Sequence, residues 1–417
     1  MRVRIHRGAN EIGGNCVELA GADGCRLVLD LGRPLWAGWD DEVELPDVAG
    51  LRDPDPSLLG VVISHPHLDH YGLVRKVDSS VPIYIGREAA ALVRAASFFS
   101  SMSGGFDPVG FLRHGEAFEL GPFRITPFLN DHSAFDAYSL LVEADGRRLF
   151  YTGDLRAHGR KAALFEQLLE HPPPDVEVLL MEGTHVRPDN THDQAVLETE
   201  GQLEDRFVEL CRSTDGAVMV AGSAQNLDRL VTVYRAARRV CRELVVDLYG
   251  ATVAAATRST IPQPGFEALR VYVPQRQRVL VKETEEFWRT EQVRPVRVYP
   301  EELADEPGRF MFHVPSSTIR ELISARVLDH RGVAPWSLWD GYLRGPAGEA
   351  LKRMLDDHDI RLVHVHTSGH ASVSDLQRLV KAMKPNRVVP IHSEATDRFA
   401  ELFPDAECHP DGQWWSA

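Results

Sequence analysis

Four residues of metal-binding type lie within six positions of the chain: His65, His67, Asp69 and His70. They follow the apolar run 60–63, so we expect them on the loop that leaves a buried strand. In an extended segment side chains alternate sides, so His65 and His67 point the same way, and a turn through Asp69 and His70 presents these two to a neighbouring point. Imidazole and carboxylate fit zinc, and also manganese or iron, while the absence of Cys argues against a closed structural site. The pattern predicts two adjacent metal ions.

This H-x-H-x-D-H stretch resembles the signature of the metallo-β-lactamase superfamily, whose members are one- or two-metal hydrolases built on an αβ/βα sandwich. Taken singly, a downstream histidine would more often be an ordinary core or loop residue. The remaining motifs of the superfamily occur in order along the chain, however, and we identify their key residues as Asp30, His132, Asp154 and His392.

The resemblance implies how these residues divide between two Zn²⁺ ions, with Mn²⁺ as the alternative metal. One ion would bind His65, His67 and His132, the other Asp69, His70 and His392, and Asp154 would bridge them. Two such ions about 3.5–4 Å apart would supply a water nucleophile and stabilise phosphodiester oxygens. Asp30 would orient a ligand histidine, or it would have only a structural role in its loop.

Length and composition place the chain among globular proteins of more than one domain. It has 417 residues, of which 43% are hydrophobic. No apolar run approaches membrane-spanning length, and the first residues lack the apolar core of a secretory signal. The five cysteines are scattered and odd in number, which suits reduced thiols. We therefore expect a cytoplasmic protein without membrane association.

The net charge of -15 argues against a nucleic-acid ligand, because phosphate binding draws on Lys and Arg. Net charge averages over surfaces, however. Four arginines recur at helical spacing on one face: Arg235, Arg238, Arg239 and Arg242. This arginine stripe would either track phosphates or be an ordinary solvated helix face.

The order of expected elements predicts an α/β protein with an inserted domain. Short strands separated by glycine-bearing turns fill the N-terminal part. Beyond Asp154, strands alternate with helices, which implies a parallel sheet within an insertion. We expect a first part of the metallo-β-lactamase domain at 1–190, an inserted β-CASP domain at 191–348 and the return of the first domain at 349–417.

Three features resemble the β-CASP branch of the superfamily, whose members are nucleases. Glu182 follows an expected strand in Met181-Glu182-Gly183-Thr184. Within the segment 223–229, Asn226 and Arg229 match an Asn and an Arg of ribonuclease J. The segment 366–371 together with 390–394 is similar to the paired closing motifs of ribonuclease J, and it contains Ser368, Gly369 and His370.

The resemblance implies roles for these residues. His370 would donate to the scissile phosphate and Glu182 would hold it, so that Asp69, Glu182 and His370 form the catalytic set. Ser368 and Gly369 would line a phosphate pocket, with an ordinary turn as the alternative. Asn226 and Arg229 would bind substrate.

We therefore expect a ribonuclease J-like enzyme that cleaves RNA as an exo- or endonuclease, with single-stranded DNA as a further possible substrate. The alternatives are a small-ester or thioester hydrolase on the same core and, from another class, an inactive nucleic-acid-binding protein. Ribonuclease J normally continues into a C-terminal dimerisation domain, which this sequence does not contain, so the expected homodimer rests on the resemblance alone.

Overall fold

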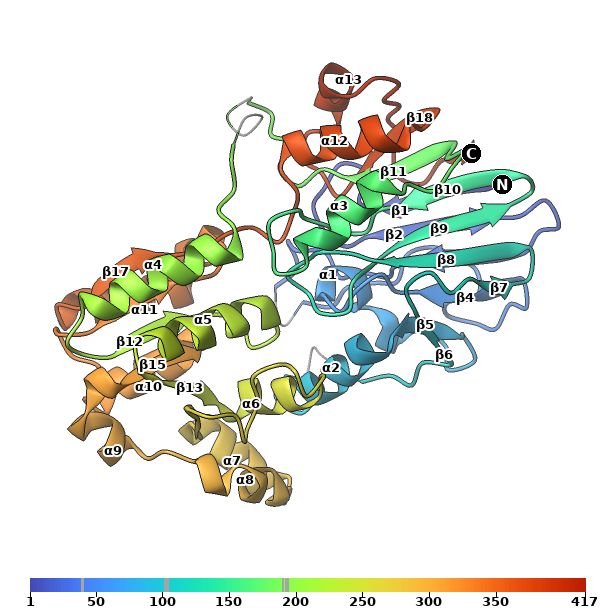
Figure 1. The fold of residues 1–417 in the computed structure, drawn as a ribbon. Helices are drawn as coiled ribbons and strands as arrows, with labels where there is room; N and C mark the ends of the chain where they lie inside the picture. The colour runs from blue at the N-terminus through green and yellow to red at the C-terminus, as the bar shows by residue number, and fades with distance from the viewer. Residues whose placement is uncertain (39–40, 101–104, 190, 192–194) are drawn as a thin grey trace. The chain divides into compact units, whose positions relative to one another are not determined.

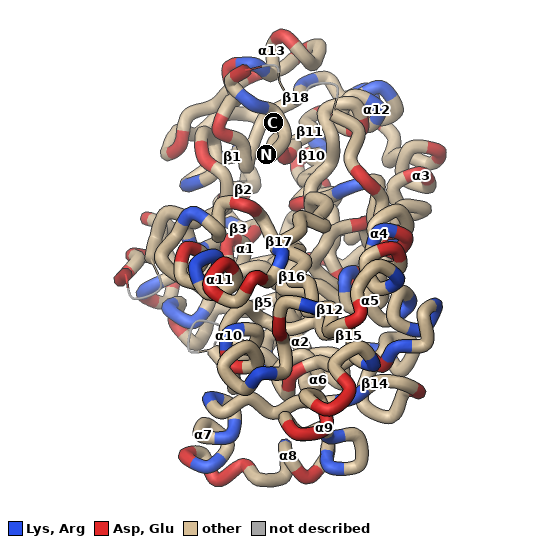
Figure 2. Tube along the Cα trace, turned by 90° about the vertical axis from the view of Figure 1, so that its left-hand side faces the viewer, with Lys and Arg blue, Asp and Glu red and all other residues tan. Residues whose placement is uncertain are grey.

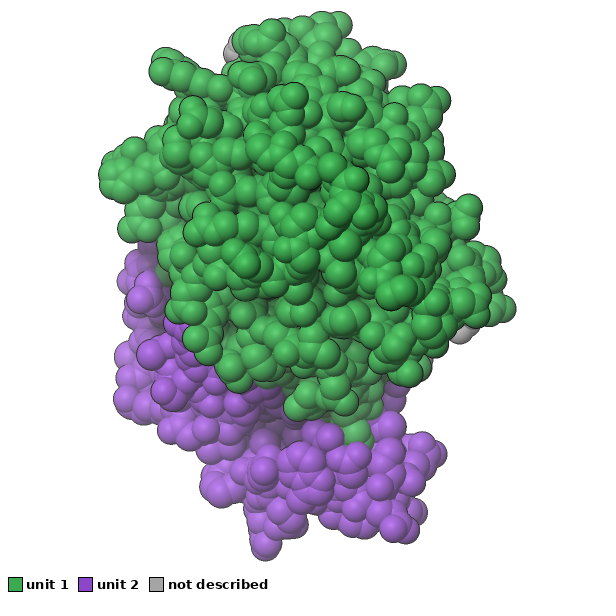
Figure 3. All heavy atoms as spheres, turned by 90° about the vertical axis from the view of Figure 1, so that its right-hand side faces the viewer, with its two compact units in different colours: residues 1–197, 369–417 green, residues 198–368 purple. Residues whose placement is uncertain are grey.

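The computed structural model describes residues 1–38, 41–100, 105–189, 191 and 195–417. They form two compact units (Figure 3). Unit 1 comprises Met1–Leu197 and Gly369–Ala417, and unit 2 comprises Glu198–Ser368. The chain therefore builds most of unit 1, then the whole of unit 2, and returns to complete unit 1.

Unit 1 contains two sheets (Figure 1). The first has the strand order β19-β1-β2-β3-β4-β5-β6. Its strands are β1 (Arg2–Arg7), β2 (Cys16–Ala20), β3 (Arg26–Leu29), β4 (Leu58–Val62), β5 (Ile83–Gly86), β6 (Gly110–Leu112) and β19 (Trp414–Ser416). The second has the order β18-β11-β10-β9-β8-β7. Its strands are β7 (Phe118–Leu120), β8 (Phe123–Leu129), β9 (Tyr138–Ala144), β10 (Arg147–Tyr151), β11 (Val178–Glu182) and β18 (Arg387–Ile391).

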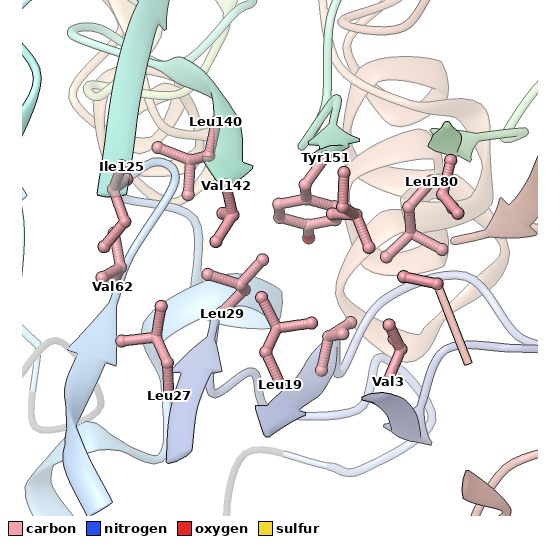
Figure 4. Packing of buried hydrophobic residues seen from close by; sticks show 14 of the residues in the cluster. Val3, Leu19, Leu27, Leu29, Val62, Ile125, Leu140, Val142, Tyr151 and Leu180 are labelled. Atoms are coloured by element: carbon pink, nitrogen blue, oxygen red, sulfur yellow. The ribbon is translucent and has the colours of Figure 1, made fainter. Parts of the chain in front are cut away.

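The main core of unit 1 lies between these sheets. Leu19 and Leu29 of the first sheet point toward Val142, Tyr151 and Leu180 of the second (Figure 4). Further apolar clusters join α2 to the first sheet and α3 and α12 to the second. This arrangement confirms the predicted αβ/βα sandwich. The helices of unit 1 are α1 (Leu68–Tyr71), α2 (Arg87–Ser97), α3 (Ala162–Glu170), α12 (Val373–Met383) and α13 (Phe399–Leu402).

Unit 2 contains one sheet, with the order β14-β13-β15-β12-β16-β17, and all of its pairings are parallel. Its strands are short, apolar and largely buried, as is usual for a parallel sheet. They are β12 (Val218–Ala221), β13 (Glu243–Asp247), β14 (Leu269–Tyr272), β15 (Phe310–Val314), β16 (Val333–Trp336) and β17 (Arg361–His364). This confirms the predicted α/β insertion.

The helices of unit 2 connect these strands. The first helix is capped by Thr199. The Thr199 side chain accepts a hydrogen bond from the Gln202 N–H, and the Gln202 side chain accepts one from the Thr199 N–H. The helices are α4 (Glu200–Arg212), α5 (Leu227–Arg239), α6 (Leu248–Ala255), α7 (Gln275–Glu283), α8 (Trp288–Gln292), α9 (Pro300–Asp305), α10 (Ser316–Ser324) and α11 (Pro346–Asp357).

The boundaries of the insertion differ from those predicted. From the sequence we predicted that the chain returns to the first domain at residue 349, and this residue lies within α11. The structure places α11 and β17 in unit 2, because β17 is the edge strand that pairs with β16. The return therefore comes at Gly369.

Within the described ranges, no helix combines the length and the apolar character needed to cross a membrane. All five cysteines are free.

Candidate metal centre

Each of the seven predicted ligands follows the end of a strand or lies on the short helix behind one. His65 and His67 follow β4, and α1 carries Asp69 and His70. The remaining ligands follow β8, β10 and β18: His132, Asp154 and His392. Because β10, β11 and β18 are parallel neighbours, their carboxyl ends meet at one edge of the second sheet. The sandwich thus gathers residues that are far apart in the sequence.

Two groups of ligand-type residues form at this edge, and Asp154 belongs to both. Within each group the ligand atoms all lie within 4.8 Å of one another. The first group is His65, His67, His132 and Asp154, and the second is Asp69, His70, Asp154 and His392. The structure brings together the same two sets that the resemblance implied.

The spacing inside the groups suits metal coordination. His132 Nε2 lies 3.1 Å from His67 Nδ1, and His70 Nε2 lies 3.1 Å from Asp154 Oδ2. His65 Nε2 lies 3.6 Å from the same Asp154 oxygen. Ligand atoms bound to one zinc at about 2.0–2.2 Å stand about 3–3.5 Å from one another in a tetrahedral arrangement.

Several of these atoms are buried and make no hydrogen bond. They are Nε2 of His65, His70 and His392 and both carboxylate oxygens of Asp154. Buried polar atoms in native proteins almost always have a partner, and one divalent cation in each group would satisfy these five atoms. The donor set of imidazoles and carboxylates therefore fits zinc or manganese.

The electrostatics favour the metal-binding protonation state at four of the ligands, whereas at His70 burial lowers the pKa but the Asp154 and Asp30 carboxylates raise it well above its usual value. Burial lowers the pKa of His67 to about 4, and it lowers the pKa of His65 and of His132 well below the usual value. Burial would raise the pKa of Asp154, but the His392, His70 and His370 imidazoles hold it well below its usual range. Neutral imidazoles and an ionised carboxylate are the forms in which these side chains coordinate metals.

Asp30 holds one of the ligand imidazoles. It follows β3 in the left-handed conformation, with φ 58°. Its Oδ2 lies 2.7 Å from His70 Nδ1 and accepts from Ser64 Oγ and from the Tyr151 hydroxyl, each at 2.7 Å. Since Nδ1 of His70 is engaged, Nε2 faces Asp154 and Asp69.

Two other imidazoles are oriented in the same way. His132 Nδ1 lies 2.6 Å from the Gly369 carbonyl oxygen, and His392 Nδ1 lies 3.0 Å from Asn15 Oδ1. Because each contact occupies Nδ1, Nε2 of the same ring remains available to bind a metal. A Cβ at Gly369 would come within 2.6 Å of Ser133 Oγ, so a larger residue there would have to displace the Ser133 side chain.

Glu182 and His370 form a pair beside the two groups without joining either. His370 Nδ1 lies 3.3 Å from Glu182 Oε2 and 3.1 Å from Thr184 Oγ1. Glu182 is fully buried, whereas His370 is 19% exposed. Burial lowers the pKa of His370, but the carboxylates of Glu182 and Asp154 raise it to about 9. The imidazole is therefore a cation at neutral pH.

Arg229, for which a substrate contact was predicted, makes its contacts within unit 2. Its side chain is fully buried in unit 2, where Nη2 lies 3.0 Å from Glu200 Oε1 and Nε donates to Glu200 Oε2 at 3.2 Å. Asn226 caps α5, and its Oδ1 accepts from the N–H of Arg229 at 3.0 Å. Both side chains are engaged in the structure of unit 2. Ser368 is half-buried at the end of unit 2, and its predicted contact with phosphate stays a prediction.

No motif in the sequence indicated the residues that support the His132 loop. Arg156 is fully buried with its Nε 3.4 Å from Asp131 Oδ1, next to His132. Lys161 Nζ donates to the His132 carbonyl oxygen at 3.2 Å. Nothing in the sequence indicated a role for the hydroxyl of Tyr151, which lies at the end of an apolar strand.

Comparisons with known proteins agree with this geometry. A model described as "Beta-lactamase superfamily domain" matches residues 37–221, and one described as "Zn-dependent metallo-hydrolase RNA specificity domain" matches residues 357–407. Both descriptions are of metallo-hydrolase domains, so the chain is similar to the metallo-β-lactamase superfamily, as its motifs predicted. Several of its relatives are named ribonuclease J.

Among these relatives, ribonuclease J of Sinorhizobium meliloti is 23% identical over 371 residues, covering 85% of this chain and 61% of the relative. Ribonuclease J of Mycobacterium tuberculosis is 27% identical over 57% of this chain and 42% of the relative. The chain thus spans about half the length of these two relatives. The crystal structure of a protein of unknown function from Enterococcus faecalis V583 shares the fold, with a TM-score of 0.79, 22% identity and 99% coverage of both chains.

Proposed function

We propose that the chain is a two-metal phosphodiesterase that cleaves RNA. The pairing of His370 with Glu182 beside two groups of metal ligands is the observation that carries this proposal. The match to an RNA specificity domain over residues 357–407 and the ribonuclease J relatives support RNA as the substrate.

In this proposal His65, His67 and His132 hold one metal, Asp69, His70 and His392 hold the other, and Asp154 contributes to both. Bound metals would activate water and stabilise the phosphodiester oxygens during in-line attack. The protein's own contribution is orientation, since Asp30, Asn15 and the Gly369 carbonyl each fix one imidazole through Nδ1.

His370 supplies a proton or a hydrogen bond to the substrate. Its Nδ1 faces the buried Glu182 carboxylate, so the proposal assigns the donated proton to Nε2. Glu182 keeps the ring charged and oriented, and its own position is fixed by the N–H groups of Thr184 and Ala371. Asp69 lies beside both His70 and His392, where it would bind metal next to the attacking water.

Two alternatives use the same fold. A hydrolase of small esters or thioesters would need the metal ligands but would have no evident use for the Glu182–His370 pair. An inactive RNA-binding protein would have no need of all seven ligand side chains in coordinating positions. Homodimer formation and a cytoplasmic location remain predictions from the sequence.

The test uses the full chain loaded with zinc or with manganese and assayed on end-labelled, single-stranded RNA and DNA of the same sequence. We expect RNA to be cleaved faster than DNA. Release of a labelled mononucleotide would identify exonuclease action, and a ladder of products would identify endonuclease action. Brisk thioester hydrolysis with both nucleic acids left intact would overturn the proposal.

A further inference from the structure

Charge does not by itself mark a substrate contact on this chain. In the arginine stripe, Arg238 pairs with Glu267 at 2.9 Å, and Arg239 pairs with Asp205 at 2.7 Å. Figure 2 shows Asp and Glu positions interspersed with Lys and Arg positions over the face that it presents. A nucleic acid also offers flat base faces, however, and proteins contact these with aromatic rings. An exposed ring beside the metal centre would be such a contact.

Trp36 is the most exposed aromatic side chain among the described residues, at 71%, and its neighbour Leu35 is 57% exposed. Within the described ranges, no other ring and no cation lies over the Trp36 indole. Phe111, another exposed ring of unit 1, differs in this respect, because the guanidinium of Arg87 lies 4.1 Å from its ring centroid. The face of the indole is therefore available to a ligand.

Leu35 and Trp36 are the two central residues of a turn, in which the N–H of Ala37 donates to the Pro34 carbonyl oxygen at 3.3 Å. Central positions of turns are usually occupied by Gly, Pro, Asn, Asp or Ser, which favour the turn conformation or bond to nearby main chain. Leu and Trp do neither. A single exposed apolar residue is common, but here two adjacent ones are left in water. Formation of the turn therefore does not account for these two residue types.

The turn is tied to loops that carry residues of the metal centre. The N–H of Arg33 donates to the carbonyl oxygen of Leu68 at 2.9 Å, and an antiparallel bridge joins the turn to Gly13. Gly13 has a φ of +83°, and a Cβ there would lie 2.7 Å from Leu35 Cγ and 3.1 Å from Asp69 Oδ2. Leu35 and the Asp69 carboxylate therefore both lie against Gly13, so the turn stands beside the second ligand group.

The ring of Trp36 is also held in place. Its side chain forms a hydrogen bond with Glu11, which lies in the same loop as Gly13. Burial raises the pKa of the Glu11 carboxyl, and the charge of Arg7 and this hydrogen bond oppose the rise. A ring that is exposed but already oriented loses little conformational freedom when a ligand stacks on it.

Asp69 marks the side from which a substrate reaches the second ligand group. Its side chain is 14% exposed, whereas the side chains of His70, Asp154 and His392 are at most 1% exposed. A phosphodiester that binds there passes Asp69, next to the turn. The bases beside the scissile phosphate then come close to Leu35 and Trp36, whereas a small ester has no base to place there.

We propose that Trp36 stacks on a nucleobase of RNA next to the scissile phosphate and that Leu35 packs against the same nucleotide. The proposal rests on the proposed function, because the phosphate must lie at the metal centre. Stacking tolerates any sequence, since every base has a flat face. It favours nucleic acid over small esters without drawing on cations, in a chain whose net charge is -15.

The test uses the metal-loaded, full chain and two single-stranded oligomers of equal length, an RNA and a ribose-phosphate chain without bases. Trp36→Ala should raise KM for the RNA about 5-fold or more, the usual effect of losing one stacked base, with kcat close to wild type. Its KM and kcat on the base-free oligomer should equal those of the wild type. Its metal content should also be unchanged.

Three further variants isolate the ring. Trp36→Gln keeps a donor for Glu11 and should behave like Trp36→Ala, so it also replaces that variant if Trp36→Ala folds poorly. Trp36→Phe should restore most of the wild-type KM. Trp288→Ala is the matched control, because it removes a half-exposed tryptophan of unit 2 whose ring centroid lies 4.4 Å from the Arg289 guanidinium. It should leave the kinetics on both oligomers unchanged.

An unchanged KM of Trp36→Ala for RNA would overturn the proposal. Equal losses on the RNA and on the base-free oligomer would do the same, because a purely structural role of Trp36 affects both substrates alike. So would a concentration-dependent dimer that Trp36→Ala dissociates while KM for RNA stays at the wild-type value.

Equilibrium binding separates this proposal from the proposed function. A wild-type chain that cleaves neither oligomer would contradict the nuclease, but its affinities for the two oligomers would still decide on Trp36. Tighter binding of the RNA, lost in Trp36→Ala, would support the stacking contact. Equal affinities of the wild type for the two oligomers would refute it.

Discussion

Asp30 Oδ2 lies 2.7 Å from Nδ1 of His70, and neither side chain is exposed to solvent. This contact selects the nitrogen that His70 presents to the metal. Asp30→Asn should therefore lower affinity for the second metal about 10–100-fold, the usual effect of losing such a partner. Metal content measured during dialysis against a weak chelator would show it. Asp107→Asn, on an exposed side chain, is the control and should retain both metals.

His370 and His392 should respond differently to the same substitution. His392→Ala should release a metal and abolish activity together, because Nε2 of His392 belongs to the second ligand group. His370→Ala should keep both metals and lose about 10²–10⁴-fold in the rate of RNA cleavage. Glu182→Gln should show a smaller loss of the same kind. Full activity of His370→Ala with both metals bound would refute its role as a donor.

Arg229 should matter for stability and not for catalysis. Arg229→Met leaves the buried Glu200 carboxylate without its cationic partner, and breaking a buried ion pair in this way costs about 3–5 kcal/mol. Chemical denaturation of the full chain should show this loss, while the cleavage rate per folded molecule stays close to wild type. Arg239→Met removes an exposed ion pair and should change neither quantity. A substrate-binding Arg229 would instead raise KM at unchanged stability.

Asp247 should make the stability of unit 2 depend on pH. Burial raises its pKa from 3.8 to about 6, so folding favours the protonated acid. Its contribution to stability is complete below pH about 4 and is lost as the pH rises through about 6. The free energy of unfolding of the wild type should thus fall as the pH rises over this range, apart from the effects of other titrating groups.

Asp247→Asn should remove this dependence and stabilise the chain at pH 7. The amide can still cap α6 by accepting from the N–H of Gly250, as the carboxylate does at 2.8 Å. Its NH2 group would replace Oδ2, which now accepts from Gln277 Nε2 at 2.7 Å, so the Gln277 amide has to turn over and accept through Oε1. Denaturation curves of both proteins at pH 4 and pH 7 would test this, and a variant less stable than wild type at pH 7 would contradict it.

The metal centre was predictable from the sequence because its ligands follow strands in short, ordered motifs. His65, His67, Asp69 and His70 are neighbours in the chain, and parallel strands bring distant strand ends to one edge. The matching of motifs therefore sufficed to assign His132, Asp154 and His392 to the same place. The sandwich followed from the same resemblance.

The failures concern residues whose surroundings come from distant segments. Arg229 was matched to a substrate contact, but Glu200 and Ser337 bury it, and nothing near Arg229 in the sequence indicates this. For the arginine stripe, whose two readings the sequence left open, Arg238 and Arg239 pair with carboxylates of α4 and with Glu267, which favours an ordinary solvated helix face at these two positions. Residue 349 was a reasonable boundary by pattern, since only the pairing of β16 with β17 shows that the sheet of unit 2 continues beyond it.

The discontinuity of unit 1 has a consequence for its synthesis on the ribosome. The segment Gly369–Ala417 supplies β18 and β19, which pair with β11 and β1. Until that segment is translated, β11 and β1 are open sheet edges that can pair with other chains. Unit 2 has no such dependence and can fold while the chain is still being made. The last ligand, His392, is translated only after unit 2, so the second ligand group is completed late in synthesis, whereas the first group is complete once Asp154 has been made.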